Sequence, residues 1–528
     1  MSLLNVENLE VSFVTRNGTS KAVKGVSFTV EPKQITAIIG ESGSGKSVSC
    51  YALLGLIPSP PGRIDGGVAS FEGRNLLALS EVELRKIRGS DIAMIFQDPM
   101  TCLNPYLTIG EQLIEPLLIH RNLSRADAKT RAIELLNEVG IRSPDSTFDS
   151  FPHEFSGGMR QRVMIAMALI NEPKLLIADE PTTALDVTIQ AQILRLIADL
   201  QKHRDIGVLF ISHDLAVVSD IADQIVVMEQ GEVVESGAPD AIFNHAQHPY
   251  TQKLLAAIPS GERDSGKAKD DALINVRNLR TWFQASGKAE PVKAVDDVSF
   301  DIHRGEILGL VGESGSGKST LGRSIMRLAP ITSGEVTFDE MNLTALAGRH
   351  LKNFRSRMQM IFQDPFASLN PRMTVYDTLA EPLLLHNICQ RANLDQHIAK
   401  LMDDVGLARN FIRKYPHEFS GGQRQRIAIG RALATRPEFI VADEPVSALD
   451  VTIQAQILDL LMALGREHNL TMLFVSHDMA VIRHIADRVL VMYQGKVVEA
   501  GPVTQVFNQP QAPYTQSLLA SIPGAAML

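Results

Sequence analysis

One eight-residue string, GESGSGKS, occurs twice in this chain of 528 residues, at 40–47 and again at 312–319. Each copy follows an apolar run, QITAII or EILGLV, that has the length of a buried strand. A glycine-rich turn that ends in Lys and Ser, between a strand and a helix, is the arrangement in which backbone N–H groups surround phosphate oxygens. The sequence therefore predicts two phosphate-binding loops.

The rest of the chain is duplicated as well. The strings FQDP, PHEFSGG, ADEP, DVTIQAQIL and SHD occur in the same order in each half. A repeat of this length indicates two copies of one domain, not a solenoid of short repeats. The polar segment ERDSGKAKDDA between the copies has the composition of a linker. We expect a first domain at 1–261, a linker at 262–272 and a second domain at 273–528.

Each half reads as an α/β domain. Strand-like apolar runs such as LLIAD and FIVAD alternate with amphipathic segments, one of which places Ile189, Ile193, Ile197 and Leu200 on a single helical face. This alternation predicts a mainly parallel sheet flanked by helices, with ligands at the carboxyl ends of its strands.

Composition narrows the class of protein. No apolar run approaches the roughly 18 residues of a membrane span, and the start has no basic and apolar leader. Cys50, Cys102 and Cys389 lie too far apart in sequence for a disulfide framework or a paired-cysteine metal site. The formal net charge of −9 argues mildly against a nucleic-acid binder and leaves a local basic patch as the one alternative. We expect a protein of a reducing compartment that does not bind nucleic acid.

Side chains for phosphate chemistry surround the two loops. Lys46 and Lys318 are placed to reach the terminal phosphates of a nucleotide, and the hydroxyls of Ser47 and Ser319 to bind Mg²⁺.

An acidic pair follows an apolar strand in each half. Asp179 and Asp443 end these strands, as a ligand of Mg²⁺ or its water should. Glu180 and Glu444 come next and are candidates to polarise the attacking water. Taken alone, such pairs are equally consistent with solvated acidic turns.

The segment SGG opens a helical run in each half, at Ser156 and Ser420, 23 residues before the aspartate. Serine before glycines is by itself an ordinary helix cap. Together with the loop, the Gln of FQD, the acidic strand, the ALD segment and the later His, however, it resembles the ABC ATPase family over nearly the whole chain. The resemblance implies two tandem P-loop NTPase domains, each with a helical signature subdomain, that bind ATP and Mg²⁺.

The same resemblance assigns roles to residues. It implies catalytic roles for Glu180, Glu444, His213 and His477, and Mg²⁺ contacts for Ser47, Gln97, Asp179, Ser319, Gln363 and Asp443. It implies nucleotide contacts for these Mg²⁺-site residues and for the loops, the signature segments and one aromatic residue per half: Gly40, Glu41, Ser42, Gly43, Ser44, Gly45, Lys46, Ser156, Gly157, Gly158, Phe13, Gly312, Glu313, Ser314, Gly315, Ser316, Gly317, Lys318, Ser420, Gly421, Gly422 and Phe283. The two phenylalanines stand where the family carries an adenine-stacking aromatic, and they are equally consistent with core positions.

In this family each nucleotide lies between the loop of one domain and the signature of the other. The resemblance thus pairs Lys46 with Ser420 and Lys318 with Ser156. It also places a groove for the membrane subunits after Gln97 and Gln363, in stretches that carry the leucines 113, 117, 118, 379, 383 and 384. These leucines could instead be core.

Two kinds of machine use such paired domains. GESGSGKS, FQDPxxxLNP, DVTIQAQIL and the tail PYTQ are similar to the ATPases of bacterial dipeptide and oligopeptide importers, whose fused versions serve peptides, glutathione or microcin C-type compounds. This resemblance implies two integral-membrane permease subunits and a periplasmic binding protein as partners, and a peripheral position on the cytoplasmic face of the inner membrane. The alternative is a soluble tandem ABC ATPase that acts on ribosomes or DNA. A short linker and scattered cysteines favour the importer.

Overall fold

The computed structural model divides into two compact units, Met1–Ile258 and Pro259–Ile522, each of which is described by itself below. The residues described are 2–15, 18–98, 102–141, 143–182, 186–259, 261, 271–284, 290–447 and 449–523. The expected linker at 262–272 lies almost entirely outside them, so its bounds stay a prediction.

Unit 1 carries the first loop. Its strands are β1 (Leu4–Thr15), β2 (Gly18–Val30), β3 (Ile35–Ile39), β4 (Gly62–Phe71), β5 (Arg74–Asn75), β6 (Ile92–Ile95), β7 (Leu175–Asp179), β8 (Gly207–Ile211), β9 (Gln224–Glu229) and β10 (Glu232–Gly237). Its helices are α1 (Lys46–Leu53), α2 (Glu81–Ile87), α4 (Ile109–His120), α5 (Arg125–Glu138), α6 (Pro144–Phe148), α7 (Gly157–Leu169), α8 (Val187–Arg204), α9 (Leu215–Ile221), α10 (Pro239–His245) and α11 (Pro249–Ala256).

Unit 2 repeats this order. Its strands are β11 (Ala272–Phe283), β12 (Val292–His303), β13 (Ile307–Val311), β14 (Ser333–Phe338), β15 (Met341–Asn342), β16 (Met358–Ile361), β17 (Phe439–Asp443), β18 (Thr471–Val475), β19 (Arg488–Tyr493) and β20 (Lys496–Pro502). Its helices are α12 (Lys318–Ile325), α13 (Gly348–Arg355), α14 (Pro365–Ser368), α15 (Val375–Leu385), α16 (Leu394–Asp404), α17 (Gly421–Leu433), α18 (Val451–His468), α19 (Met479–Ile485), α20 (Val503–Asn508) and α21 (Pro513–Ala520).

Two sheets build each unit. In unit 1 the larger sheet has the order β10-β9-β3-β8-β7-β6 within the described residues, and all its pairings are parallel except β9 with β10. The smaller sheet, β2-β1-β4-β5, is antiparallel. Unit 2 has the same two orders, counted in the same direction, with β13 at the place of β3. The mainly parallel sheet is as predicted from the sequence, whereas the antiparallel one was not anticipated.

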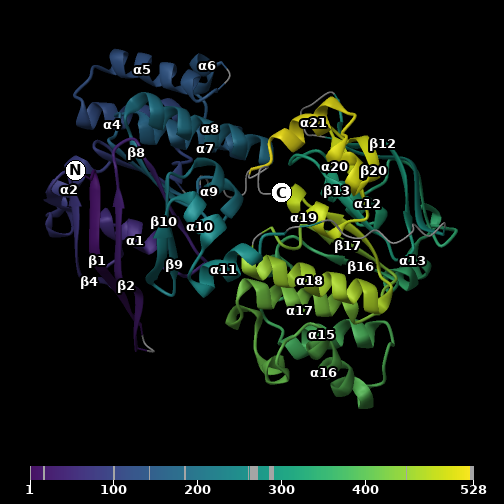
Figure 1. Ribbon diagram of the computed structural model, residues 1–528. Coiled ribbons are helices and arrows are strands. Elements are labelled where there is room, and N and C mark those ends of the chain that lie inside the picture. Colours follow the sequence, from purple (N-terminus) through teal and green to yellow (C-terminus); the bar gives the residue numbers. More distant parts are fainter. Residues whose placement is uncertain are drawn as a thin grey trace. The chain divides into compact units, whose positions relative to one another are not determined.

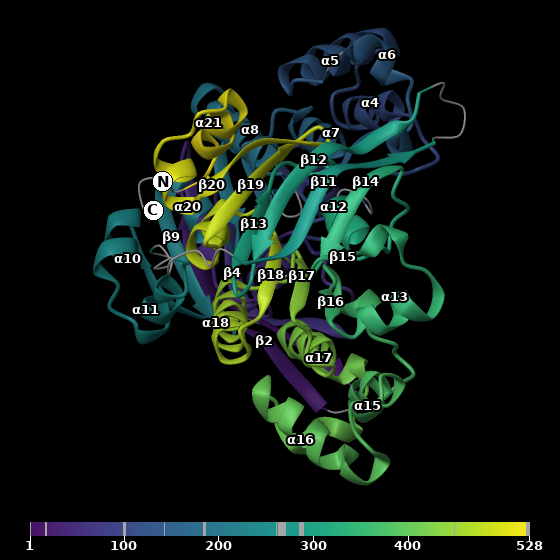
Figure 2. The same ribbon diagram turned by 90° about the vertical axis from the view of Figure 1, so that its right-hand side faces the viewer.

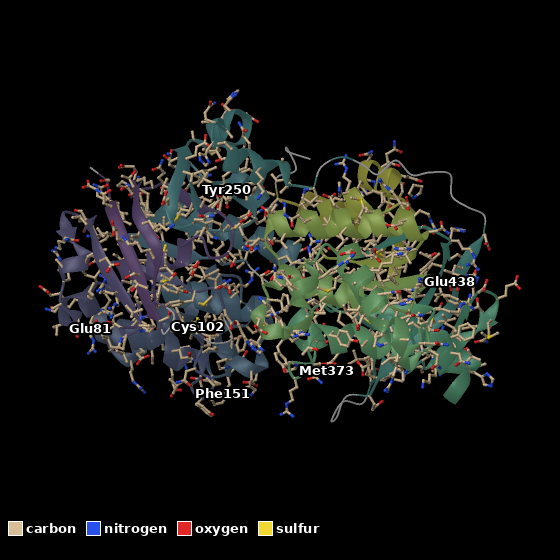
Figure 3. The ribbon with its side chains drawn as sticks, turned by 90° about the horizontal axis from the view of Figure 1, so that it is seen from below. Glu81, Cys102, Phe151, Tyr250, Met373 and Glu438 are labelled. Atoms are coloured by element: carbon tan, nitrogen blue, oxygen red, sulfur yellow. The ribbon has the colours of Figure 1, made fainter. Side chains whose placement is uncertain are left out.

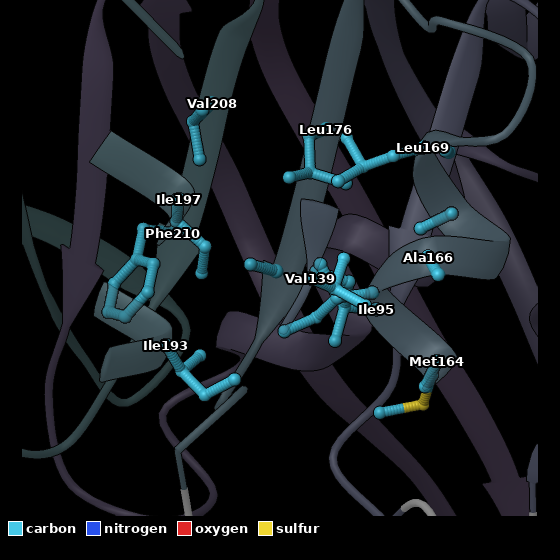
Figure 4. Close-up of a cluster of buried hydrophobic side chains, with 14 of the residues drawn as sticks. Ile95, Val139, Met164, Ala166, Leu169, Leu176, Ile193, Ile197, Val208 and Phe210 are labelled. Carbon is cyan, nitrogen blue, oxygen red and sulfur yellow. The ribbon is translucent and has the colours of Figure 1, made fainter. Parts of the chain in front are cut away.

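Side chains of the central strand alternate between two cores. Ala37 and Ile39 face the helices on one side of the larger sheet, and Ile38 faces the space shared with α1 and the smaller sheet. Figure 4 shows the first of these cores, where Phe210 of β8 lies near Ile193 and Ile197 of α8. A strand buried on both faces has no polar side, which is why these segments read as continuous apolar runs.

A helical layer stands apart from the smaller sheet in each unit. Figures 1 and 2 show α4, α5 and α6 of unit 1, and α15 and α16 of unit 2, at the end of their unit that lies away from the antiparallel strands. Leu113, Leu117, Leu379 and Leu383 are buried in this layer, and Leu118 and Leu384 pack against the same cores. Of the two roles that the sequence left open for these leucines, the four buried ones have the core role and stabilise the helical layer, and a docking role stays a prediction for the more exposed positions.

Candidate nucleotide site

The predicted phosphate loop joins β3 to α1 in unit 1 and β13 to α12 in unit 2. At Gly40 a Cβ atom would lie 2.2 Å from the carbonyl oxygen of Met228, and at Gly312 one would lie 2.1 Å from that of Met492. Gly45 and Gly317 cap the helices with φ of 97° and 105°, a region that favours glycine. The glycines thus let the loop fold tightly against β9 or β19, with the N-terminus of the helix at its end, where anions are stabilised.

The loop lysines are buried inside their own loops. Lys46 Nζ donates to the carbonyl oxygens of Gly40 and Glu41 at 2.8 and 2.9 Å, and Lys318 Nζ to those of Gly312 and Glu313 at 2.7 and 2.8 Å. An ammonium held this way spans the loop, where it can neutralise phosphate charge.

The serine after each lysine meets the acidic strand. Ser47 Oγ donates to Asp179 Oδ1 at 2.9 Å, and Ser319 Oγ donates to Asp443 Oδ1 at 2.8 Å. The second oxygen of each carboxylate, Oδ2, is buried and accepts no hydrogen bond from any described residue. Burial raises the pKa of both aspartates, although the serine hydrogen bonds act in the opposite direction. A buried carboxylate oxygen beside a hydroxyl is a donor set that suits Mg²⁺, so these residues fit the predicted ion.

A glutamine, a glutamate and a histidine converge next to the serine–aspartate contact in each unit. In unit 1 Gln97 Nε2 donates to Glu180 Oε2 at 2.8 Å, and His213 Nδ1 lies 3.2 Å from Glu180 Oε1. In unit 2 Gln363 Nε2 donates to Glu444 Oε2 at 2.8 Å, and His477 Nδ1 lies 3.2 Å from the same oxygen. The structure therefore joins the predicted Gln, Glu and His within each unit.

The glutamates are held in an unusual backbone conformation. Glu180 and Glu444 both have a φ of 47°, the left-handed region that few residues other than glycine adopt. Their N–H groups donate to the carbonyls of Ile211 and Val475 at 3.0 Å, which fixes them at the ends of the strands. Such strain persists where the surroundings impose it, and it gathers at functional sites.

Electrostatic interactions strengthen the contact between Glu444 and His477 in unit 2. Burial opposes the charged form of both partners, but their hydrogen bond and charge outweigh it. The pKa of Glu444 is consequently lowered and the pKa of His477 is raised. The glutamate is thus kept ionised, as a group that accepts a proton from water must be.

The predicted signature segments cap long helices. Ser156 Oγ accepts from the N–H of Met159 at the start of α7, and Ser420 Oγ accepts from that of Gln423 at the start of α17, both at 3.4 Å. In unit 2 the Gln423 side chain also accepts from Ser420 N at 3.2 Å, which completes a capping box. No described hydrogen bond joins either serine to the loop of its own unit. The pairing of each signature with the opposite loop stays a prediction.

The two aromatic candidates lie on the antiparallel sheets. Phe13 of β1 packs partly against the core that α1 shares, whereas Phe283 at the end of β11 is 40% exposed. The structure thus leaves adenine stacking open at Phe283 and gives Phe13 at least a partial core role.

Sequence reasoning missed two groups beside the site. The hydroxyls of Tyr250 and Tyr514 accept hydrogen bonds from the N–H groups of Glu41 and Glu313 in the loops. Figure 3 marks Tyr250 in unit 1. The repeated PYTQ was a signal, but the chain separation of 209 residues hid the contact. The side chain five positions after each loop lysine, Tyr51 or Arg323, lies next to the aspartate and differs between the halves.

The sequence also matches two models of known protein families. The family model described as "ABC transporter" matches residues 23–183 and 295–447. The chain belongs to the ABC transporter family. It is an ABC transporter ATPase with two tandem ATPase domains, as the sequence predicted. A second model, "Oligopeptide/dipeptide transporter, C-terminal region", matches 234–280 and 498–526 of this ABC protein.

Relatives align over nearly the full length of this ABC ATPase. The "Glutathione import ATP-binding protein GsiA" of Pectobacterium atrosepticum is 46% identical over 99% of this chain and 90% of its own. Its counterpart of the same name in Escherichia coli (strain K12) is 47% identical with the same coverage. The "Peptidoglycan transport ATP-binding protein YejF" of Agrobacterium fabrum is 46% identical over 98% of this chain and 96% of its own. Within the described residues, no helix combines the length and apolar character that a membrane crossing requires.

Proposed function

We propose that this ABC ATPase is the ATP-hydrolysing subunit of a bacterial importer for peptides or peptide-like compounds such as glutathione. The observation that carries the proposal is the complete set of Lys, Ser, Asp, Glu, Gln and His contacts in both units, in a chain that carries two oligopeptide/dipeptide transporter C-terminal regions. Relatives named for glutathione and peptidoglycan transport support this class of cargo. The cargo itself is selected by other subunits.

Hydrolysis in this proposal depends on exchanging the contacts around the glutamates. Glu180 and Glu444 are held by a glutamine and a histidine, and each must turn one oxygen to the attacking water to accept its proton. Gln97 and Gln363 then leave the carboxylate for the metal side of the site, and His213 and His477 turn to the terminal phosphate. When bound by Ser47, Asp179 and their equivalents, Mg²⁺ supplies charge neutralisation for the departing phosphate.

The two ATP sites are composite in this proposal. Lys46 acts with Ser420, and Lys318 acts with Ser156, so that two helix N-termini point at one terminal phosphate. Fusion of the domains supplies both halves at high effective concentration. What supports this is the presence of a capped signature helix in each unit.

A charged substitution in one signature tests the pairing. Ser420→Arg is expected to weaken ATP-analogue crosslinking at the Lys46 loop and to spare the Lys318 loop, and Ser156→Arg is the matched control with the opposite pattern. Digestion and mapping of the labelled peptides reads out each loop separately. Loss of label at the Lys318 loop alone in Ser420→Arg would show that each signature serves its own domain.

The partners in this proposal are two integral-membrane permease subunits and, through them, a periplasmic binding protein. The ATPase then sits peripherally on the cytoplasmic face of the inner membrane and binds no nucleic acid. In unit 2 a groove of about 720 Å³ suits a short permease helix, because it lies between Gln363 and the end of α15 and includes the exposed Leu385. Gln363 connects this groove to Glu444.

Reconstitution decides the overall proposal. The chain, co-expressed with the permease pair of a glutathione or oligopeptide importer, is expected to drive uptake of labelled peptide into membrane vesicles. The vesicles contain ATP on the side of the ATPase, and the binding protein is added on the outside. Lys46→Ala together with Lys318→Ala is the control that removes both phosphate loops. Uptake that is unaffected by this control would rule out the proposed function.

A further inference from the structure

One corner of the helical layer is built differently in the two units. In unit 1 it is closed by ion pairs: Arg131 Nη2 lies 2.9 Å from Glu172, Arg131 Nη1 lies 3.5 Å from Glu138, and Arg204 also pairs with Glu138. Glu134 adds a further contact to Arg131 at 3.4 Å. These pairs connect α5 of the helical layer to the turn before β7 and to the end of α8, so they fasten this layer to the larger sheet.

The repeat identifies the same five positions in unit 2, and their charges are changed. The matched strings VG at 139–140 and 405–406, and the proline after Glu172 or Arg436, fix the alignment. Arg131, Glu134, Glu138, Glu172 and Arg204 correspond to His397, Lys400, Asp404, Arg436 and His468. Unit 1 has two arginines and three glutamates at these positions. Unit 2 has one lysine, one arginine, two histidines and one aspartate. No salt bridge is described for any of the five in unit 2.

The equivalent corner of unit 2 contains a pocket. These five side chains line a pocket of about 260 Å³, together with buried apolar residues such as Leu401. Lys400 and His397 come from α16, Arg436 from the turn before β17, and His468 from the last residue of α18. Positive charge therefore borders the pocket from both the helical layer, through Lys400, and the sheet side, through Arg436, with the two histidines as further hydrogen-bonding groups.

We propose that this pocket binds a small multivalent anion, either a phosphate monoester or a compact polycarboxylate. Lys400 and Arg436 place two positive charges at one cavity, and an anion between them gains charge-assisted hydrogen bonds from the lysine and from the fork of the arginine. The volume lies just below the range of about 300–1,000 Å³ that is usual for ligand pockets, so it suits a compact ligand and excludes a nucleotide. The lone Asp404 is left to orient a histidine or a ligand hydroxyl.

The bound anion does in unit 2 what the glutamates do in unit 1. It connects α16 to the turn before β17 and to α18, and so fastens the helical layer to the larger sheet. The neighbouring α17 carries Ser420 at its start, so occupancy of the pocket sets how firmly that signature helix is held. Neither Lys318 nor Asp443 lines this pocket, and its test does not depend on transport.

Hydrogen exchange of the full chain gives a readout confined to this corner. Inorganic phosphate and citrate are added in separate titrations, with sodium chloride at matched ionic strength as reference. One of the two anions is expected to slow amide exchange in residues 394–404 at millimolar concentration and to leave the equivalent residues 128–138 of unit 1 unchanged. Slowing by phosphate assigns a phosphate ligand, and slowing by citrate alone assigns a polycarboxylate.

Variants make the test specific. Lys400→Glu with Arg436→Glu restores the unit 1 residues at two positions and should raise the anion concentration for half-maximal protection at least about tenfold, since two charge-assisted contacts are lost. Lys253→Glu, an exposed lysine outside the corner, is the matched control and should behave as wild type. If the double variant does not fold, Lys400→Gln and Arg436→Gln singly should each weaken protection. Equal protection with sodium chloride, or an unchanged response in these variants, overturns the proposal.

Discussion

The hydroxyl of Tyr250 accepts a hydrogen bond from the backbone N–H of Glu41 at 3.0 Å, and Tyr514 repeats this contact with Glu313 at 3.1 Å. Both tyrosines lie in the segments that match the oligopeptide/dipeptide transporter C-terminal region. Each C-terminal region of this ABC ATPase therefore holds the second residue of its phosphate loop. A ring fixed on the loop limits the backbone conformations that the loop adopts before nucleotide binds.

Removal of this hydroxyl should weaken nucleotide binding at one loop. Tyr250→Phe is expected to lower ATP affinity at the Lys46 loop about two- to tenfold, because one neutral hydrogen bond contributes about 0.5–1.5 kcal/mol. Binding is measured with a fluorescent ATP analogue in a Lys318→Ala background, which leaves one loop functional. Tyr514→Phe in the same background is the matched control and should change nothing. Unaltered affinity in Tyr250→Phe would mean that the ring only packs.

The two halves should differ in their need for Mg²⁺. Arg323 Nη2 lies 3.8 Å from Asp443 Oδ2, so a guanidinium competes with the ion for this carboxylate. In the first half the neighbour is Tyr51, a phenol whose pKa is raised by burial and by the Asp179 carboxylate. The site at Lys318 should accordingly require more Mg²⁺. Arg323 is half exposed, so solvent screening limits the effect to about two- to fivefold.

A swap tests this difference. Arg323→Gln should lower the Mg²⁺ concentration for half-maximal binding of the fluorescent nucleotide at the Lys318 loop, and Tyr51→Arg should raise it at the Lys46 loop. Each titration is done in a background where the other loop lysine is alanine. The same Mg²⁺ dependence in wild type and both variants would show that the neighbour has no influence on the ion.

Permease docking should depend on exposed apolar residues at the ends of α4 and α15. Ile119 and Leu385 occupy equivalent positions and are 63% and 54% exposed, although both side chains are large and apolar. Ile119→Asp and Leu385→Asp should abolish co-purification with the permease subunits while ATP binding is retained. Val82→Asp, at a 67% exposed position on α2, is the control that should still co-purify. Co-purification of both test variants would place the docking surface elsewhere.

The chemistry of the loops could be predicted from the sequence because the residues that carry it are neighbours along the chain. Lys46, Ser47 and the strand before them are consecutive, and the phosphate-binding geometry follows from glycines in the same string. Asp179 and Glu180 were predicted from the ends of apolar strands, and in the structure Ser47 contacts Asp179 and Gln97 contacts Glu180, although the sequence had indicated Gln97 as a ligand of Mg²⁺. The exact repeat of GESGSGKS in the second half removed the ambiguity of the loop motif.

Features that depend on distant packing were beyond the sequence. The antiparallel sheet pairs β1 with β4 across the whole phosphate loop and α1, so no local pattern marks that pairing. Leu113 and Leu379 resembled a docking face because amphipathic helices look the same whether they cover a core or bind a partner. The left-handed backbone of Glu180 and Glu444 likewise follows from the strands around them and not from the residue type.

We expect both halves of this ATPase to hydrolyse ATP and to do so as one coupled machine. Steady-state phosphate release by wild type, Glu180→Gln, Glu444→Gln and the double variant measures this most directly, with ATP affinity checked in parallel. Loss of a catalytic base costs roughly 10²–10⁴-fold at its own site. If the two sites open and close together, each single replacement should lower total turnover well beyond twofold while ATP still binds, and the double should fall to background. A single replacement that keeps at least about half of the wild-type rate would contradict the claim, because the remaining half would then work alone.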